Sequence, residues 1–143
     1  MLIDRIDVRA PGDEHARSVP AVQAVAGKGL VGDRYFHADG ARPGLALTLI
    51  DAAVVAAVGL QPGETRRQLT VTGSGAELYA LIGKRFRIGD VECYGVEICE
   101  PCLHLQQVTR PGILRELVHR GGINADILTD GTIAVGNPVV ADP

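Results

Sequence analysis

The chain has 143 residues, the length of one ordinary domain, and 46% of them are hydrophobic, which is enough for a substantial core. Its net charge of −3 argues against a nucleic-acid partner, because neutralising phosphates requires a basic surface. No apolar run reaches the ~18 residues of a membrane span, and charges interrupt the N-terminal residues, so we expect neither a membrane partner nor a signal peptide. We therefore expect a cytoplasmic protein in which residues 1–143 form a single domain.

The elements predicted in chain order are mostly strands. Asp51 is a typical N-cap for a helix over 52–58, and two further short helices are expected over 76–82 and 111–119. Residues 103–108 give no clear prediction. About eight or nine strands in hairpin order favour a closed or nearly closed β-barrel with a few short peripheral helices, because closure removes exposed edges. The predicted strands are 2–8, 19–26, 45–50, 68–72, 85–88, 91–98, 123–128, 132–135 and 139–140.

The strongest chemical signal is the sequence Cys99-Glu100-Pro101-Cys102. The chain has three cysteines, and a low, odd number does not indicate a secreted disulfide framework. Pro101 is expected to end the preceding strand and to place both thiols in a loop. A thiolate is both a nucleophile and a soft metal ligand, so the pair is a candidate for either chemistry.

Several interpretations of this pair remain open. A thioredoxin-like redox pair is disfavoured because no helix begins at Cys99. A further alternative is that both cysteines are simply buried core residues. A structural zinc site needs two further ligands, and Cys93, His104 and His119 form no second close pair. Cys93 alternates on a strand and is expected in the core. His104 can promote the thiolate of Cys102 or act as an acid or base, although a lone histidine near a cysteine is often incidental.

The second constellation is cationic. Arginine side chains beside glycines in an acidic protein are candidates for an anion site, because a guanidinium binds oxyanions with two parallel hydrogen bonds. The alternative is that these cations are solvated surface charges. Asp33 either orients Arg34 or stabilises its turn. The candidate cations are Lys28 and Arg34 around a glycine-rich turn, Arg66 and Arg67 where a loop enters a strand, and Arg120 before Gly121-Gly122.

Taken together and in order, several segments of the chain resemble the MOSC domain, the module at the C-terminus of molybdenum-cofactor sulfurases. The resemblance spans about residues 1–140. Two positions depart from the common pattern: Gln68 stands where Asn usually follows the arginine pair, and Asn137 stands where Asp usually follows glycine. The segments are 29–34 (GLVGDR), 47–50 (LTLI), 66–71 (RRQLTV), 81–89 (LIGKRFRIG), 99–102 (CEPC), 121–125 (GGINA) and 130–136 (DGTIAVG).

The resemblance implies a MOSC-type closed β-barrel with a few peripheral helices, one key cysteine, Cys102, and binding of the molybdenum cofactor, molybdopterin. In the amidoxime-reducing relatives the matching cysteine coordinates molybdenum, so Cys102 is also the implied metal ligand. Pyridoxal phosphate is connected to this chain by family association only, since no Schiff-base lysine motif is present. Three arginines, Arg34, Arg66 and Arg67, are the implied anchors for the cofactor phosphate. The full set of implied cofactor-binding residues is Lys28, Asp33, Arg34, Arg66, Arg67 and Arg120.

The leading functional hypothesis is a molybdenum-cofactor-associated sulfur carrier. Cys102 would carry a persulfide received from a cysteine desulfurase or another sulfur donor, and His104 would assist. Cys99 is either a resolving thiol for Cys102 or a bystander. One alternative is a molybdenum-dependent reductase of N-hydroxylated compounds, with Cys102 as metal ligand and a separate electron-transfer partner. Another alternative is a non-catalytic module that binds a pterin or another anion.

Overall fold

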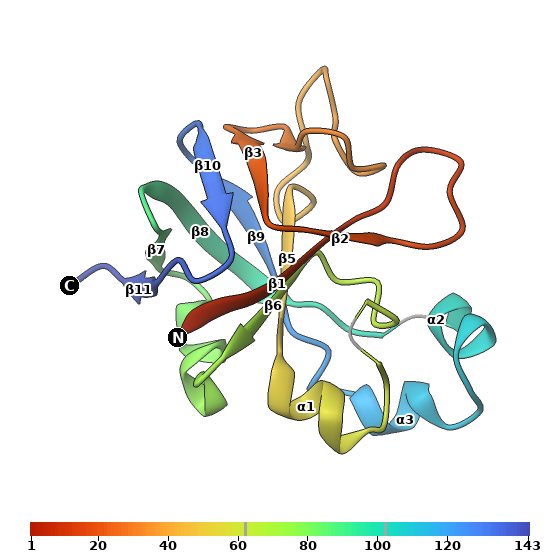
Figure 1. Cartoon of the computed structure of the whole chain (residues 1–143). Helices are drawn as coiled ribbons and strands as arrows, with labels where there is room; N and C mark the ends of the chain where they lie inside the picture. The colour runs from red at the N-terminus through yellow and green to blue at the C-terminus, as the bar shows by residue number, and fades with distance from the viewer. Residues whose placement is uncertain (62, 102) are drawn as a thin grey trace.

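The computed structural model describes residues 1–61, 63–101 and 103–143, and these residues are mainly β (Figure 1). One sheet has eight strands in the order β11-β7-β8-β9-β5-β6-β1-β2. A second sheet has three strands in the order β10-β3-β4. The strands are β1 (Leu2–Val8), β2 (Arg17–Val19), β3 (Ala21–Val25), β4 (Gly29–Leu30), β5 (Leu47–Asp51), β6 (Leu69–Thr72), β7 (Arg85–Ile88), β8 (Val91–Ile98), β9 (Ile123–Ile127), β10 (Gly131–Ala134) and β11 (Val139–Ala141).

Three short α-helices gather below one end of the sheet in Figure 1: α1 (Ala52–Ala57), α2 (Leu103–Val108) and α3 (Ile113–Leu117). Asp51 caps α1 as predicted, since its carboxylate accepts a 2.8 Å hydrogen bond from the Ala53 amide. Two 3₁₀ turns, η1 (Gly75–Glu77) and η2 (Tyr79–Leu81), lie where a short helix was expected. In the described part of the chain, every helix is too short or too polar to cross a membrane.

The prediction of a closed barrel is wrong. The large sheet is strongly curled, but within the described residues its ladder ends at β11 on one edge and at β2 on the other. The segment before β11 approaches β1 through an isolated bridge between Leu2 and Pro138, and the Ile3 amide donates to the Asn137 carbonyl at 2.9 Å. The Val139 amide donates to the Met1 carbonyl at 2.9 Å on the other side of the bridge, and among the described residues the pairing goes no further than this single bridge.

Two hydrophobic clusters hold these layers together. The larger cluster fills the concave side of the sheets and includes Phe86, Ile3 and Leu49, all fully buried. The smaller cluster lies beneath the helices, where Leu105 of α2 and Ile113 of α3 pack with residues of α1 and β5. The helical layer therefore has its own core, and this core fixes α2 against the end of the sheet.

Most local predictions agree with the structure, and the differences have physical causes. The predicted hairpin is formed by β7 and β8, with Arg85 opposite Tyr94. The strand expected over 19–26 is divided between β2 and β3 at Pro20, which cannot donate to a ladder. The helix expected over 111–119 is shortened to α3, because Gly112 adopts a left-handed conformation with φ of 90° just before it.

At Gly95 the strand β8 passes very close to the main chain of η2 and the segment after it. The Gly95 carbonyl accepts from the Gly83 amide at 2.8 Å, and its amide donates to the Lys84 carbonyl at 3.0 Å. A Cβ atom at this position would lie 2.1 Å from the Leu81 carbonyl oxygen. Only glycine allows β8 to pass η2 at this distance.

We therefore expect Gly95→Ala to lower the free energy of unfolding by about 3 kcal/mol, because the backbone must move to accept one methyl group. Urea denaturation measures this loss. Gly12→Ala is the matched control: Gly12 has φ of 86° but open space around it, so its loss should be only about 1 kcal/mol. Equal losses in the two variants would contradict the close approach.

Candidate functional site

A cavity of about 630 Å³ opens between the end of β1, the loop after it, the turn after β4, the loop before β6, and α2. Its wall is rich in charged side chains, although the chain as a whole is acidic. Such a concave site with a few convergent polar groups is typical of small-molecule binding. The charged or titratable residues used below are Arg5, Asp7, Arg9, Asp33, Arg66, Arg67 and His104.

Arg9 and Arg66 give one wall of the cavity its positive charge. Within the described residues, no carboxylate lies within ion-pair distance of either guanidinium. Burial, followed by the neighbouring guanidinium groups of Arg66 and Arg34, lowers the pKa of Arg9. Arg66 also has a left-handed backbone, with φ of 62°, which is strained for a residue with a side chain. The two guanidinium groups can therefore bind an anion, in a cavity whose lining also includes the carboxylates of Asp13, Glu14 and Glu64.

Arg67 has a different role from its neighbour, because its guanidinium is occupied by main-chain carbonyls. Its Nε donates to the Gly121 carbonyl at 2.7 Å, and Nη2 donates to the Cys99 carbonyl at 3.2 Å and the Glu100 carbonyl at 3.4 Å. Arg67 is only 8% exposed. It therefore joins the start of β6 to the cysteine-containing loop and to the segment that enters β9.

Glycine at position 121 makes this arrangement possible. A Cβ atom at Gly121 would lie 2.1 Å from the Cys99 carbonyl oxygen and 3.2 Å from Arg67 Nη2. Gly121 is thus required by close packing around the arginine fork. Gly122 is required by a different contact, because a Cβ atom there would lie 2.0 Å from the Leu49 carbonyl oxygen.

Asp33 and Gln68 form the polar floor of the cavity. Asp33 Oδ1 accepts from the Arg9 amide at 3.0 Å, and Oδ2 accepts from Gln68 Nε2 at 2.8 Å and from the Tyr35 amide at 3.2 Å. Gln68 Oε1 in turn accepts from the Thr48 amide at 2.9 Å. Asp33 is buried, so this network fixes the main chain of Arg9 and directs its side chain from a rigid base.

Arg5 and Asp7 line the cavity as an ion pair. Arg5 Nε lies 2.9 Å from both carboxylate oxygens, and the Asp7 side chain is 2% exposed. Burial raises the pKa of Asp7, and the hydrogen bond from Arg5 opposes that shift. The pair adds no net charge when both groups are ionised. The other charged groups of the lining are of both signs: Arg9, Arg66, Arg67, Asp13, Glu14, Asp33 and Glu64.

His104 contributes to the cavity from α2, where it is exposed. The next residue, Leu105, is 1% exposed and lies in the hydrophobic cluster under the helices. Burial of Leu105 therefore fixes the rotation of α2 and keeps His104 on the side of the cavity.

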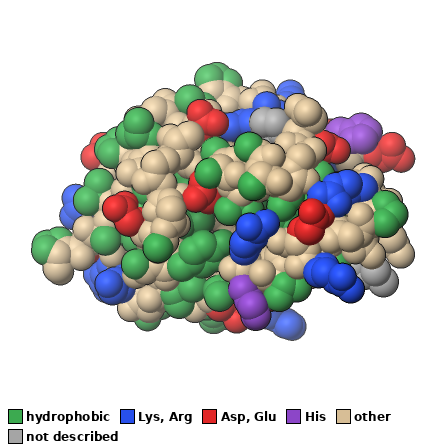
Figure 2. All heavy atoms as spheres, turned by 90° about the horizontal axis from the view of Figure 1, so that it is seen from below, with side chains coloured by type: hydrophobic (Ala, Val, Ile, Leu, Met, Phe, Trp, Pro, Cys, Tyr) green, Lys and Arg blue, Asp and Glu red, His purple; other side chains and the backbone are tan. Residues whose placement is uncertain are grey.

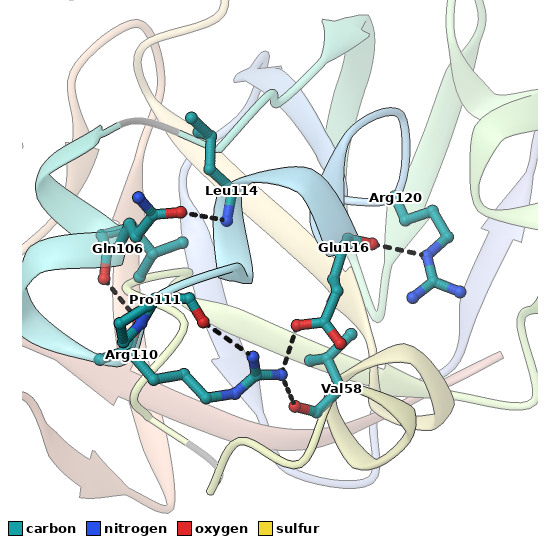
Figure 3. Close-up of polar contacts among 9 residues, drawn as sticks. Val58, Gln106, Arg110, Pro111, Leu114, Glu116 and Arg120 are labelled. Carbon is teal, nitrogen blue, oxygen red and sulfur yellow. Dashed lines mark hydrogen bonds and ion pairs between the residues drawn. The ribbon is translucent and has the colours of Figure 1, made fainter.

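Polar contacts fasten α2 to the other helices, as Figure 3 shows. Arg110, just beyond α2, donates through Nη2 to the Val58 carbonyl at 2.6 Å and lies 2.5 Å from a carboxylate oxygen of Glu116. Gln106 accepts from the Leu114 amide at 3.2 Å. The helix that follows the cysteine loop is thus attached to both α1 and α3.

The three cysteines differ in what the structure says of them. Cys102 lies outside the described residues. Cys99 is half-buried at the end of β8, and its amide donates to the Gly122 carbonyl at 2.8 Å. Cys93 is fully buried as predicted, and burial raises its pKa to about 12, so its thiol is unreactive at neutral pH.

Three predicted cofactor-binding residues do not line this cavity: Lys28, Arg34 and Arg120. Arg34 lies over the Tyr35 ring, 5.4 Å from its centroid, and Arg120 donates to the Glu116 carbonyl at 3.1 Å (Figure 3). On the face shown in Figure 2, basic and acidic side chains are interspersed. Among residues 1–61, 63–101 and 103–143, no three His, Cys, Asp or Glu side chains are placed to hold a metal ion.

Sequence reasoning missed Arg5, Asp7, Arg9 and Tyr35. A signal was present for the first three, because charged residues alternate at positions 5, 7 and 9 and alternate side chains of a strand share one face. Tyr35 follows the glycine-rich turn and gave no separate signal.

The sequence profile of the MOSC domain matches residues 33–140. The chain belongs to the MOSC domain family. This family is generally associated with the molybdenum cofactor, which agrees with the resemblance found in the sequence. The profile includes the turn at Asp33, the arginine pair, the cysteine loop and the double glycine.

Solved structures similar to this MOSC domain extend over nearly the whole chain. YuaD protein from Bacillus subtilis superposes with a TM-score of 0.79 at 14% identity, covering 96% of this chain and 93% of YuaD. YiiM from Geobacillus stearothermophilus gives 0.74 at 16% identity, covering 99% and 75%, and YiiM from Escherichia coli gives 0.66 at 16%, covering 100% and 70%. These likenesses establish the fold alone. No curated protein matches the chain.

The two adjacent arginines of this MOSC domain should respond differently to truncation. We expect Arg67→Ala to lower the free energy of unfolding by about 3 kcal/mol, because hydrogen bonds from a charged group are lost and buried carbonyls lose their donors. Arg67→Lys should recover only part of this loss, since an ammonium cannot reproduce the planar fork. Arg66→Ala, the matched control, should change stability by less than about 0.5 kcal/mol. Chemical denaturation of the three variants measures these values, and similar losses at both positions would contradict the assigned roles.

Proposed function

We propose that this MOSC protein is a molybdenum-cofactor-associated sulfur carrier in which Cys102 holds a persulfide beside a cofactor-binding cavity. The observation that supports the proposal is the cavity wall itself. Arg9 and Arg66 line it with no carboxylate of the described residues within ion-pair distance, and His104 lines the same cavity only two residues after Cys102. Consecutive Cα atoms are about 3.8 Å apart, so the covalent chain keeps Cys102 near His104.

The residues present fit the molybdenum cofactor that the family implies. The cavity of about 630 Å³ is within the size range of small-molecule sites. The unpartnered guanidinium groups of Arg9 and Arg66 would hold the cofactor phosphate, and a cysteine thiolate is a soft donor suited to the metal. When bound, the cofactor would supply a metal centre that accepts sulfur or transfers electrons.

The sulfur chemistry we propose is thiol–persulfide exchange. The Cys102 thiolate attacks the outer sulfur of a donor persulfide, such as one carried by a cysteine desulfurase. A new S–S bond forms on Cys102, the donor S–S bond breaks, and its electron pair leaves with the donor thiolate. Transfer to a second thiolate repeats the same exchange, so neither step needs an external oxidant or reductant. His104 would take up the Cys102 proton and stabilise the thiolate.

Release of the sulfur as sulfide needs two electrons, and we assign these to Cys99. Attack of the Cys99 thiolate on the Cys102 sulfur forms a Cys99–Cys102 disulfide and expels hydrosulfide. The Arg67 contacts with the Cys99 and Glu100 carbonyls support this role, because they fix the backbone on the N-terminal side of the loop.

The second candidate function is a molybdenum-dependent reductase of N-hydroxylated compounds, with Cys102 as metal ligand. The cavity volume favours this reductase function, since a site of about 630 Å³ can accommodate a cofactor and a small substrate together. This function would require a separate electron-transfer partner. A non-catalytic pterin-binding module is the third possibility, and in that case cofactor binding would not depend on the thiol.

Incubation with a cysteine desulfurase and cysteine should add the mass of one sulfur atom to the wild type but not to Cys102→Ala. Native mass spectrometry measures the adduct, and Cys93→Ala is the matched control, which should still be loaded because the buried Cys93 thiol is unreactive. Cys99→Ser should be loaded normally but should release no sulfide. Full loading of Cys102→Ala would refute the sulfur-carrier function.

Molybdenum analysis of protein from a molybdopterin-accumulating host separates the three functions. Molybdenum and a pterin-sized adduct that are both lost in Cys102→Ala would favour the reductase. A cofactor that persists in Cys102→Ala would favour the binding module. If the wild type carries the sulfur adduct and Cys102→Ala loses this adduct but no molybdenum, the result supports the carrier.

The arginine wall should bind orthophosphate, and calorimetric titration at low ionic strength measures the affinity. We expect Arg9→Ala and Arg66→Ala each to weaken binding about tenfold, since each removes one charge-assisted contact. Arg115→Ala is the control, because Arg115 is exposed on α3 and does not line the cavity. Unchanged affinity in both cavity variants would place the phosphate elsewhere.

A further inference from the structure

The loop between β1 and β2 brings acidic side chains to the cavity. This loop joins paired ends of the two strands, since Val8 lies opposite Arg17, and within it the Asp13 amide donates to the Ala10 carbonyl at 3.0 Å. Asp13 and Glu14 are exposed and line the cavity, as residues of α2 do. The loop and α2 lie on the same side of the molecule (Figure 1). The cavity is therefore lined by exposed carboxylates as well as by guanidinium groups.

The charged side chains of the lining fall into two sets. Members of the first set are bound within the protein; Glu64, for example, accepts from the Gln61 amide at 2.7 Å through Oε1. This set comprises Arg5, Asp7, Asp33, Glu64 and Arg67. Members of the second set make no ion pair or side-chain hydrogen bond with another described residue, and they are Arg9, Arg66, Asp13 and Glu14. Among the described lining residues, two cations and two anions thus remain for a ligand.

A ligand that uses both kinds of group must itself carry anionic and cationic groups. Guanidinium groups bind carboxylates through charge-assisted hydrogen bonds, and an ammonium group offers three donors to carboxylates. Two ligand carboxylates would occupy Arg9 and Arg66, and one ligand ammonium group would occupy Asp13 and Glu14. A small peptide with one acidic residue has this set of charges. Such a peptide also suits a cavity of about 630 Å³ better than a single amino acid does.

The cysteine loop indicates what this ligand would deliver. His104 lines the same cavity, and the covalent chain keeps Cys102 near His104. We propose that the sulfur donor for Cys102 is the persulfide of a small peptide thiol that carries two carboxylates and one ammonium group. This inference rests on the proposed sulfur-carrier function and deepens it, because it names the chemical class of the donor.

The transfer is the thiol–persulfide exchange already assigned to Cys102. The Cys102 thiolate attacks the outer sulfur of the peptide persulfide, the S–S bond of the peptide breaks, and its electron pair leaves with the peptide thiolate. The exchange needs no external oxidant or reductant. Arg9 and Arg66 would also hold the cofactor phosphate, so the peptide must leave before the cofactor enters.

Calorimetric titration at low ionic strength tests the recognition of charge without sulfur chemistry. The probe is S-methylglutathione, a tripeptide with the required charges and a blocked sulfur, and its N-acetylated form lacks the ammonium charge. N-acetylation should weaken binding to the wild type about fivefold, the effect of losing exposed ion pairs. In the double variant Asp13→Asn, Glu14→Gln, S-methylglutathione should bind about fivefold more weakly, and N-acetylation should then change the affinity by less than about twofold. Asp39→Asn removes an exposed carboxylate outside the cavity and should alter neither affinity.

Loading with glutathione persulfide, followed by mass spectrometry, tests the donor. The rate of sulfur transfer to wild type should saturate with donor concentration, because the donor binds before it reacts. Below saturation, the double variant should be loaded about fivefold more slowly, whereas its loading by a cysteine desulfurase should be unchanged.

The outcomes separate this inference from the proposed function. An N-acetylation effect that is equal in wild type and in the double variant would overturn the inference. The same conclusion would follow if S-methylglutathione failed to bind, or if glutathione persulfide loaded both proteins at the same rate, while a desulfurase still loaded Cys102. If neither donor loads Cys102, the sulfur-carrier function and the inference are both overturned.

Discussion

The buried fork of Arg67 holds together the chain segments from which the candidate site is built. It reaches from the start of β6 to the carbonyls of Gly121, Cys99 and Glu100, which belong to separate parts of the chain. Carbonyl oxygens at the ends of strands need donors when they are buried, and a planar guanidinium supplies several from one residue. The position of the cysteine loop relative to the cavity therefore depends on this single side chain.

Burial and hydrogen-bonding partners divide similar arginines into different roles. Arg67 is buried and bound by carbonyls, Arg5 is paired with Asp7, and Arg9 and Arg66 face the cavity without an acidic partner among the described residues. The Asp33 carboxylate accepts hydrogen bonds from the Arg9 amide and from the Gln68 side chain, and so it orients the main chain of Arg9. The long side chain of Gln68 matters here, because it spans from Asp33 to the Thr48 amide.

The helical layer joins the cysteine-containing loop to the rest of the fold. Leu105 is buried against residues of α1 and α3, and Arg110 binds the Val58 carbonyl and Glu116. Both contacts are made by α2 or by the residues just after it, so the helix that follows Cys102 in sequence is held on its far side. A thiol that exchanges sulfur with a partner protein needs an accessible loop between fixed ends. The Arg67 contacts and the α2 contacts provide such ends on either side of position 102.

The sequence by itself determined most of the local elements and the family. The β7–β8 hairpin and the Asp51 cap depend on residues close together in the chain, so patterns of turn and capping residues were sufficient to predict them. Only the tertiary structure decided that the sheet stays open, because closure depends on how far the segment before β11 pairs with β1, and these segments lie at opposite ends of the chain. Only the structure also separated Arg66 from Arg67 and added Arg9 to the site. These residues differ in which distant carbonyls and carboxylates surround them, and such long-range environments leave no signature in the adjacent sequence.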